Sequence, residues 1–418
     1  MKSNIKIIIL FAGFWFGLIS WSNAQVISLD SVLSLIAMKN PTLQQYDNKV
    51  HALNAYAEGS KSWMAPMVGF GPYWYPYPGQ KVMENRDKGF WMFTAEQDIP
   101  NPYKLNAKKN YLAAKSSVEE QGRKQQFNNL RAEARSIYYQ WIVREKKLSV
   151  LHENERIADL ILKLAQIRYP LNQGNLGSVY KAEARLHEVQ NMILMLHGEI
   201  EGKRLMLKVL MNLPSQFKID VDTTIQIHFH PDNILTDTLT IHEQRSDIRQ
   251  IDKMIETMRL NQQLQRAQAK PDFKIRFDHM SPRGSGMPQQ FTLMGMISIP
   301  IAPWSSKMYK SEITGMNYEI EALNKSKEAI ITQTQGELSA MSVQLNSHAQ
   351  QIENYKTKII PALQKNYKTV MLAYEENKEQ LPIVIGAWEA MNMAQMEYLN
   401  QLEEHYLMIV NYEKQLER

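Results

Sequence analysis

The 418-residue sequence contains no cysteine, although it contains 24 methionines. The lack of cysteine excludes a disulfide framework, a thiolate zinc site and a cysteine nucleophile. Beyond the N-terminus, no stretch approaches the roughly 20 apolar residues that a membrane-spanning helix requires. Any soft-metal chemistry would therefore depend on methionine and histidine, and any membrane crossing would depend on β-strands.

Catalytic motifs are missing as well. His152, His187 and His242 are each followed by a glutamate, but none is accompanied by the second histidine of a zinc protease helix. The sequence contains neither the nucleophile elbow of a hydrolase nor a glycine-rich phosphate-binding loop. We therefore expect no enzymatic activity and no cofactor.

The net charge of the chain is small. Its 48 Lys and Arg residues and 43 Asp and Glu residues give a net charge of +5, spread along the whole sequence. No basic stripe marks a nucleic-acid surface, so we expect no nucleic-acid partner. The hydrophobic fraction of 44% and charged fraction of 22% are typical of a chain that packs.

The N-terminus has the pattern of a secretory signal. Lys2 and Lys6 precede a short apolar run, and small residues lead up to Ala24. We predict that residues 1–24 are a signal peptide and that the mature chain begins at Gln25.

An internal duplication organises the rest of the sequence. Shifting the chain against itself by 205 residues aligns several landmarks. The aligned pairs are Pro66 and Pro271, Tyr169 and Tyr374, Leu176 and Leu381, and Val179 and Val384. We predict one repeat at residues 25–213, a connecting segment at 214–233, and a second repeat at 234–418. Each repeat is predicted to contain a helix, two strands, a very long helix, a tight reversal and a helix.

The two long helices are predicted from proline-poor, amphipathic stretches. Residues 103–168 contain no proline, and their apolar residues recur at helical spacings. Residues 305–374 contain only Pro361. A helix of the first length would extend roughly 100 Å at 1.5 Å per residue. Such helices do not fit one globular core, so we expect them to pack along one another in a coiled-coil or tube-like arrangement.

Two predicted strand hairpins, at about residues 66–99 and 271–300, alternate between apolar and polar side chains. The alternation is clearest in the run Phe273, Lys274, Ile275, Arg276, Phe277 and Asp278. Each run is predicted to contain about 9 to 11 residues, the length with which a tilted strand crosses a bilayer. Aromatic residues such as Trp91 and Trp304 lie near the strand ends, as in strands that face lipid.

Alternation alone leaves a second interpretation open. A sheet with one solvated face has the same pattern, so a periplasmic coiled-coil scaffold that never enters lipid is the structural alternative. If the strands do enter lipid, four of them cannot close a pore, because every strand edge must be paired there. The membrane interpretation therefore predicts an oligomer.

Both predicted helix reversals contain one motif. In each, an asparagine lies three positions after a tyrosine. A second position of interest lies six residues after the asparagine, and an alanine lies four residues after that. The two sets are Tyr169, Asn172, Ser178 and Ala182, and Tyr374, Asn377, Ile383 and Ala387. With the secretory signal, the duplication and the hairpins, this motif resembles the TolC-like outer membrane efflux protein family over essentially the whole mature chain.

In that family the asparagine position is usually glycine, and the residue six positions later is aspartate. Asparagine is a reasonable replacement, because among the residues other than glycine it adopts positive φ most readily at a helix end. Ser178 and Ile383 stand at the aspartate position, so an acidic gate there is not expected in this chain. The resemblance implies that the eight motif residues form a periplasmic tip that docks on an adaptor.

The resemblance also implies a fold and partners. The fold would be α+β, with a long α-helical barrel joined to a transmembrane β-barrel to which each protomer contributes four strands. Three copies would form a homotrimer in outer membrane lipid that extends into the periplasm. The duct would be passive, and it would work with a periplasmic adaptor (membrane fusion) protein and an inner-membrane efflux pump.

Two sets of residues on the polar side of the strands are functional candidates. Glu96, Lys274, Arg276 and Asp278 are predicted to line the barrel lumen. Met67, Met92, Met294 and Met296 are predicted to share that surface, where thioethers could bind Cu(I) or Ag(I). Residues 279–284 and 294–300 also resemble the heavy-metal, CusC-like branch of the family. The alternative cargoes are drugs, small organic molecules or a secreted polypeptide, as in type I secretion.

Overall fold

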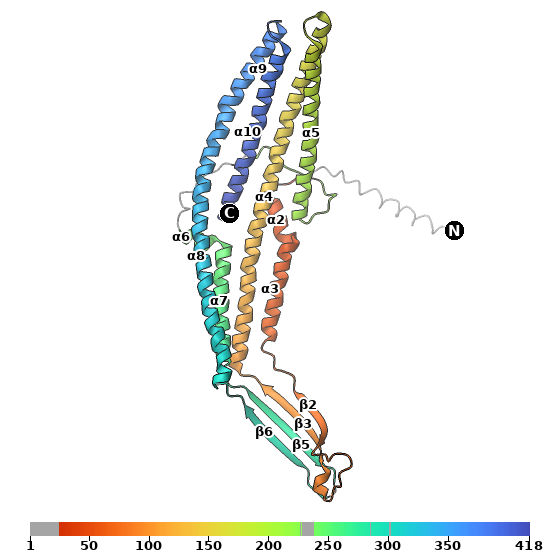
Figure 1. Cartoon of the computed structure of the whole chain (residues 1–418), viewed down its shortest axis with the longest axis vertical. Coiled ribbons are helices and arrows are strands. Elements are labelled where there is room, and N and C mark those ends of the chain that lie inside the picture. The colour runs from red at the N-terminus through yellow and green to blue at the C-terminus, as the bar shows by residue number, and fades with distance from the viewer. Residues whose placement is uncertain (1–24, 226, 228–237, 285, 301) are drawn as a thin grey trace, which may run out of the picture. The chain divides into compact units, whose positions relative to one another are not determined.

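The structure is a computed structural model that describes residues 25–225, 227, 238–284, 286–300 and 302–418 (Figure 1). The predicted signal peptide and part of the predicted connecting segment lie outside these residues. The chain divides into two compact units. The described residues of the first are 25–41, 127–225, 227 and 336–418, and those of the second are 42–126, 238–284, 286–300 and 302–335.

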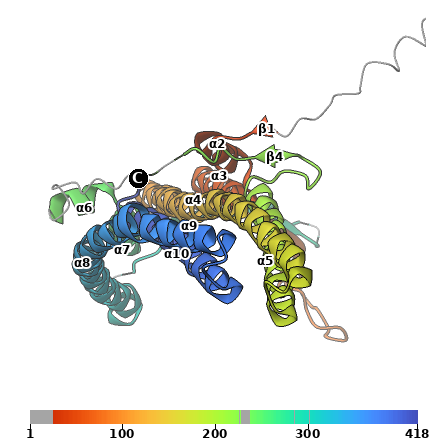
Figure 2. The ribbon, with the colours of Figure 1, turned by 90° about the horizontal axis from the view of Figure 1, so that it is seen from above.

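The first unit is a set of helices with one small parallel sheet. Its elements are β1 (Gln25–Val26), α2 (Leu29–Lys39), the later part of α4 (Pro102–Arg168), α5 (Leu176–Leu210), β4 (Ile219–Asp220), the end of α8 (Pro303–Asn354), α9 (Ile360–Glu375) and α10 (Leu381–Gln415). Strand β1 pairs with β4, which places the start of the described chain beside the segment after α5 (Figure 2).

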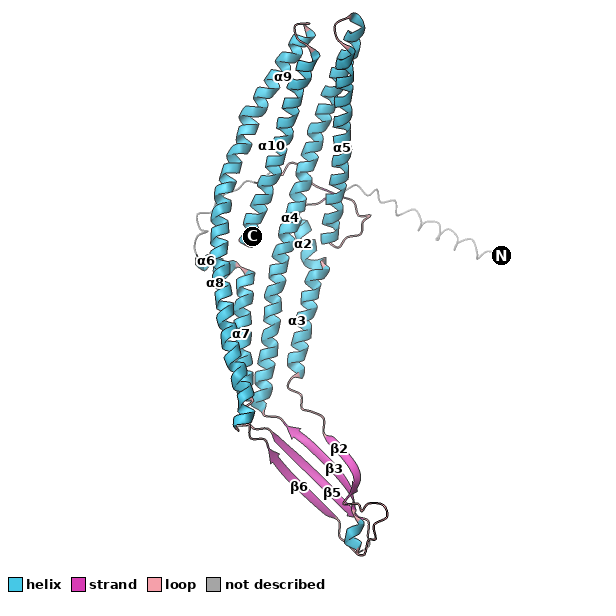
Figure 3. Ribbon diagram, in the orientation of Figure 1, coloured by secondary structure: helices cyan, strands magenta, loops and turns pink. Residues whose placement is uncertain are grey.

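The second unit combines helices with a four-stranded antiparallel sheet (Figure 3). Its elements are α3 (Pro41–Gly59), β2 (Met67–Tyr73), β3 (Phe90–Ile99), the first part of α4, α6 (Thr238–Gln244), α7 (Ser246–Ala267), β5 (Phe273–Pro282), β6 (Gln290–Ile297) and the first part of α8. Among the described residues, no helix combines the length and apolar composition needed to cross a membrane.

The long helices follow the sequence pattern, with one correction. Helix α4 contains 67 residues and begins after Asn101, whose side-chain oxygen accepts a hydrogen bond from the Tyr103 amide at 3.0 Å. The second predicted helix is not regular throughout. A wide π-helical turn at Tyr355–Ile359 separates α8 from α9, whose second residue is Pro361. Proline has no amide hydrogen and its ring crowds the preceding turn, so the helix widens there.

The sheet pairs in the order β2, β3, β5, β6, so the two hairpins join through β3 and β5. The predicted length of 9 to 11 residues is correct for β3 and β5 but wrong for β2, with seven residues, and β6, with eight. Strand β2 ends where Trp74 adopts a φ of 51°, a value that breaks the extended conformation. Pro300 closely follows β6 and cannot donate to a ladder.

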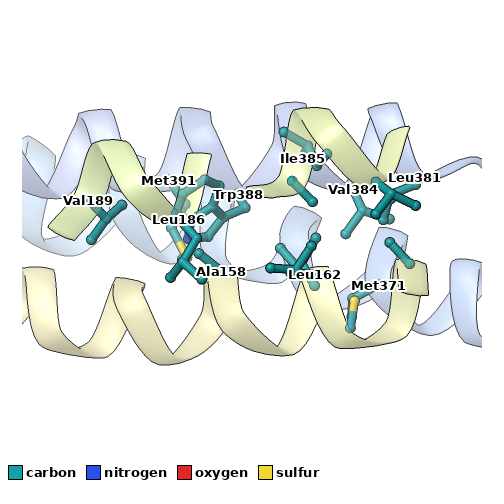
Figure 4. Packing of buried hydrophobic residues seen from close by; sticks show 14 of the residues in the cluster. Ala158, Leu162, Leu186, Val189, Met371, Leu381, Val384, Ile385, Trp388 and Met391 are labelled. Atoms are coloured by element: carbon teal, nitrogen blue, oxygen red, sulfur yellow. The ribbon is translucent and has the colours of Figure 1, made fainter. Parts of the chain in front are cut away.

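The core of the first unit lies among α4, α5, α9 and α10 (Figure 4). Side chains from all four helices contribute, including Ala158, Leu186, Met371, Val384 and Trp388. Val384 and Trp388 are almost completely buried. This apolar seam stabilises the helices on either side of the two reversals.

Candidate functional site

The register of the sheet places all four predicted lumen residues on one face. Glu96 lies opposite Arg276, and Asp98 lies opposite Lys274. Asp278 lies opposite Thr94, and residues directly opposite in an antiparallel pair point to the same side. The structure therefore brings Glu96, Lys274, Arg276 and Asp278 together on what we call the polar face.

Charges on the polar face are paired. The Lys274 Nζ atom lies 2.6 Å from Glu96 Oε1 and 3.2 Å from Asp98 Oδ1. Asp278 accepts hydrogen bonds from Thr94 Oγ1 at 2.7 Å and from Arg276 Nε at 3.0 Å. Each of these carboxylates thus has a cationic neighbour, so the charges on the polar face are nearly balanced.

The opposite face, which we call the apolar face, carries large apolar side chains that are exposed. Phe70 is 72% exposed, Leu293 67% and Ile275 47%. The Phe70 and Trp91 rings stack with their centroids 5.3 Å apart. An apolar surface of this kind on a folded protein marks a site of contact with lipid or another protein.

The four predicted methionines also lie on the polar face. Met67 lies opposite Glu96, Met294 opposite Arg276, and Met296 opposite Lys274. The structure adds Met280, which is paired with Met92 within the sheet. Met280 belongs to the run 279–284 noted from the sequence, and the period of two places it on this face of β5. The described residues contain no group of three His, Asp or Glu side chains that could hold a metal ion.

The two helix reversals have one geometry. Asn172 adopts a φ of 56° and Asn377 a φ of 60°, so the predicted positive φ is confirmed at both. The Asn172 amide donates to Tyr169 O at 3.1 Å, and the next amide, that of Gln173, donates to Arg168 O at 3.2 Å. The second turn repeats both hydrogen bonds 205 residues later. This is the Schellman motif, with asparagine in the usual place of glycine.

The predicted tip residues differ in their surroundings. Asn172, Ser178 and Tyr374 line a cavity of about 330 Å³ between the two reversals. The exposed residues of the set are Tyr169, Asn172, Asn377 and Ile383, and the buried ones are Ser178, Ala182, Tyr374 and Ala387. Only the exposed group can contact a partner without rearrangement, and a docking role for the whole set remains a prediction.

Arg168 links the two reversals and was missed by sequence analysis. Its guanidinium lies 4.2 Å from the centre of the Tyr374 ring and donates to Tyr374 O at 2.6 Å and Glu375 O at 2.9 Å. Burial raises the pKa of Tyr374, and nearby Arg168 opposes that increase. The equivalent position in the second repeat is Ala373, so the duplication gave no signal for this contact.

Comparison with known proteins identifies the architecture. No protein-family model and no curated protein sequence matches the chain. Solved structures do match. OprN, an outer-membrane channel, gives a TM-score of 0.75 at 14% identity over 93% of this chain and 89% of that chain. CusC, studied for its folding and transmembrane channel formation, gives 0.75 at 14% over 95% of each chain.

A third structure is the open state of the MtrE outer membrane channel of Neisseria gonorrhoeae, with a TM-score of 0.74 at 13% identity over 93% of this chain and 88% of that chain. The chain has the fold of an outer-membrane channel. The predicted combination of very long helices with four strands is thereby confirmed. Closure of a barrel, the number of copies and the roles of the site residues are not decided by this likeness and remain predictions.

Proposed function

We propose that the protein is the outer-membrane exit duct of a tripartite efflux system of the TolC-like type. The observation that carries the proposal is the sheet, in which one face is apolar and exposed and the other carries paired charges. Lipid would cover the first face, and water in the lumen would solvate the second. The alternative, a periplasmic scaffold that never enters lipid, would leave the apolar face exposed to water.

The sheet also supports an oligomer. Strands β2 and β6 lie at its edges, each with one side that pairs with no strand of the described chain. In lipid, unpaired backbone groups cost several kcal/mol each, about the value for a buried polar group without a partner. Joining β6 of one copy to β2 of the next removes these edges. A homotrimer would supply twelve strands, which is enough for an aqueous lumen.

The remaining parts of the proposal are supported by the resemblance of the helix reversals to the TolC-like motif and by the outer-membrane channels of similar fold. Exposed residues Tyr169, Asn172, Asn377 and Ile383 would contact the periplasmic adaptor, and an inner-membrane pump would supply the energy. The duct itself would be passive, without enzymatic activity, and would extend from the outer membrane into the periplasm.

Reconstitution of the purified mature protein tests the function directly. We expect a detergent-solubilised trimer by native mass spectrometry and discrete conductance steps in planar bilayers. The protein should also resist extraction from membranes by carbonate. A monomer that stays soluble without detergent and gives no conductance would instead indicate the scaffold.

The methionines favour a soft-metal cargo within this proposal. Five methionines share the polar face with the paired charges, and three copies of the chain would multiply each into a ring. Thioethers bind Cu(I) and Ag(I) more readily than hard cations. We therefore propose Cu(I) or Ag(I) as cargo, with drugs, small organic molecules and secreted polypeptides as the alternatives.

Replacing Met294 and Met296 together by leucine tests this cargo. Leucine keeps the volume but removes the thioethers, so Ag(I) affinity should fall about tenfold, the equivalent of about 1.4 kcal/mol. A strain that lacks the wild-type gene and carries the double variant should also tolerate less silver than one that carries the wild type. Met308→Leu, on an exposed part of α8, is the control and should change neither. Unchanged affinity and tolerance in the double variant would favour the organic or polypeptide cargoes.

A further inference from the structure

The end of the sheet farthest from its helices contains a small pocket built from two hairpin loops. The loop from β2 to β3 meets the residues that follow β5, and the Arg283 amide donates to Gly89 O at 3.1 Å. Two glycines allow this close approach. A Cβ on Gly89, whose φ is 78°, would lie 2.8 Å from Trp74 O, and one on Gly284 would lie 2.9 Å from Asn85 O. The pocket has a volume of about 300 Å³.

Two cationic side chains line this pocket. The Arg283 guanidinium lies 4.3 Å from the centre of the Tyr75 ring and 5.7 Å from that of Trp91. Lys88 lines the pocket from the other loop. Within the part of the chain that the structure describes, neither side chain forms an ion pair. Arg86, in the same loop, differs, because its Nε atom lies 2.6 Å from a Glu84 carboxylate oxygen.

The pocket lies at the border of the apolar face. Trp91 belongs to that face, where it stacks on Phe70, and the guanidinium of Arg283 is placed beside the Trp91 ring. Tyr75 and Tyr77 add aromatic surface with hydroxyl groups, and prolines after each tyrosine restrict their backbone. An apolar surface thus leads directly to an aromatic and cationic pocket.

We propose that this pocket binds the negatively charged, phosphate-bearing sugar head group of an outer-leaflet lipid. The inference rests on the proposed function, which places the apolar face in the membrane. Arg283 and Lys88 would pair with the phosphate, and Tyr75 and Tyr77 would stack against the sugar. The acyl chains would then continue along the apolar face. A soluble phosphate compound would use only the cations, whereas a lipid on the apolar face already has its head group beside them, so the geometry favours a lipid.

Two charge-matched double variants test the proposal. Lys88→Gln with Arg283→Gln removes the two pocket cations, whereas Lys81→Gln with Arg86→Gln removes two positive charges from the same loop outside the pocket. The trimer is purified from the outer membrane, and its retained lipid is identified by native mass spectrometry. Binding of detergent-dispersed lipid A, phosphatidylglycerol and inorganic phosphate is then measured for each protein.

We expect the wild type and the Lys81, Arg86 variant to retain a phosphorylated glycolipid and to bind lipid A at least tenfold more tightly than the Lys88, Arg283 variant. Equal loss in both variants would mean that only net charge matters, and the pocket would be rejected. Equally tight binding of inorganic phosphate would replace the lipid by a soluble anion, and a preference for phosphatidylglycerol would exclude a sugar head group. Conductance is recorded on the same samples. A wild type without conductance overturns the proposed function, whereas normal conductance with no difference in lipid binding overturns only the pocket.

Discussion

Replacing Ile275 by lysine is expected to prevent the protein from assembling in the membrane. Ile275 is the third residue of the central strand β5, on the apolar face, where its side chain is 47% exposed. A lysine facing lipid costs about 2–4 kcal/mol at the bilayer midplane and less toward the interfaces, and a trimer would incur the cost of this position in every protomer. Trimers of the variant in the outer membrane should therefore fall by at least tenfold, as measured by native gel electrophoresis of the solubilised membrane fraction.

Two controls distinguish the effect of the sheet face on which the side chain lies from the effect of introducing or removing a lysine. Thr292→Lys introduces the same residue on the polar face, opposite Asp278, and should assemble normally. Lys274→Ile places an apolar residue one position from Ile275 but on the polar face, and it should also assemble, although Glu96 and Asp98 lose their common partner. Equal assembly of Ile275→Lys and Thr292→Lys would show that the apolar face does not contact lipid.

The faces of the sheet could be predicted from the sequence because a period of two is a local signal. An extended chain places Phe273, Ile275 and Phe277 on one face and Lys274 and Arg276 on the other, whichever strand lies beside it. The long helix α4 was predictable for the same reason, since 67 residues without an internal break need only local periodicity. The asparagines of the two reversals were predictable from their tolerance of positive φ.

Contacts between distant segments could not be predicted in this way. The pairing of β3 with β5 and the hydrogen bonds from Arg168 to Tyr374 O and Glu375 O join positions more than 170 residues apart, and no periodic pattern specifies them. The wide turn before Pro361 depends on how the helix accommodates a missing donor. Proline predicts a disturbance there, but it does not say whether the helix ends, bends or widens.

Trp388 forms another of these long-range contacts. Its side chain is 2% exposed in the apolar seam, and its Nε1 atom donates to Asn154 Oδ1 at 2.9 Å. Asn154 is also buried, and its amide nitrogen donates to Val150 O at 2.9 Å and to Gln395 Oε1 at 3.1 Å. The indole therefore fills volume between α4 and α10 and satisfies a polar group that water does not reach.

Trp388→Ala is expected to destabilise the seam beside the helix reversals. Truncating a buried tryptophan costs about 3–5 kcal/mol through lost burial and the cavity that remains. Backbone amides at the start of α10 and around Asn154 should exchange with deuterium at least a hundredfold faster in the purified trimer, as measured by mass spectrometry of peptides. Amides of β3 and β5, in the other unit, serve as the internal reference and should not change.

Two further variants assign the effect to packing or to the hydrogen bond. Trp388→Phe keeps most of the volume but leaves Asn154 Oδ1 without its donor, which costs about 1–3 kcal/mol for a buried acceptor. Combining it with Asn154→Leu removes the unpaired Asn154 Oδ1 and should recover part of that loss, while Gln395 Oε1 gives up the Asn154 amide donor. If Trp388→Phe exchanged as fast as Trp388→Ala, the hydrogen bond rather than the volume of the indole would hold α10 against α4. If both exchanged like the wild type, the seam would not stabilise the reversals, and adaptor docking at Tyr169 and Ile383 would need another support.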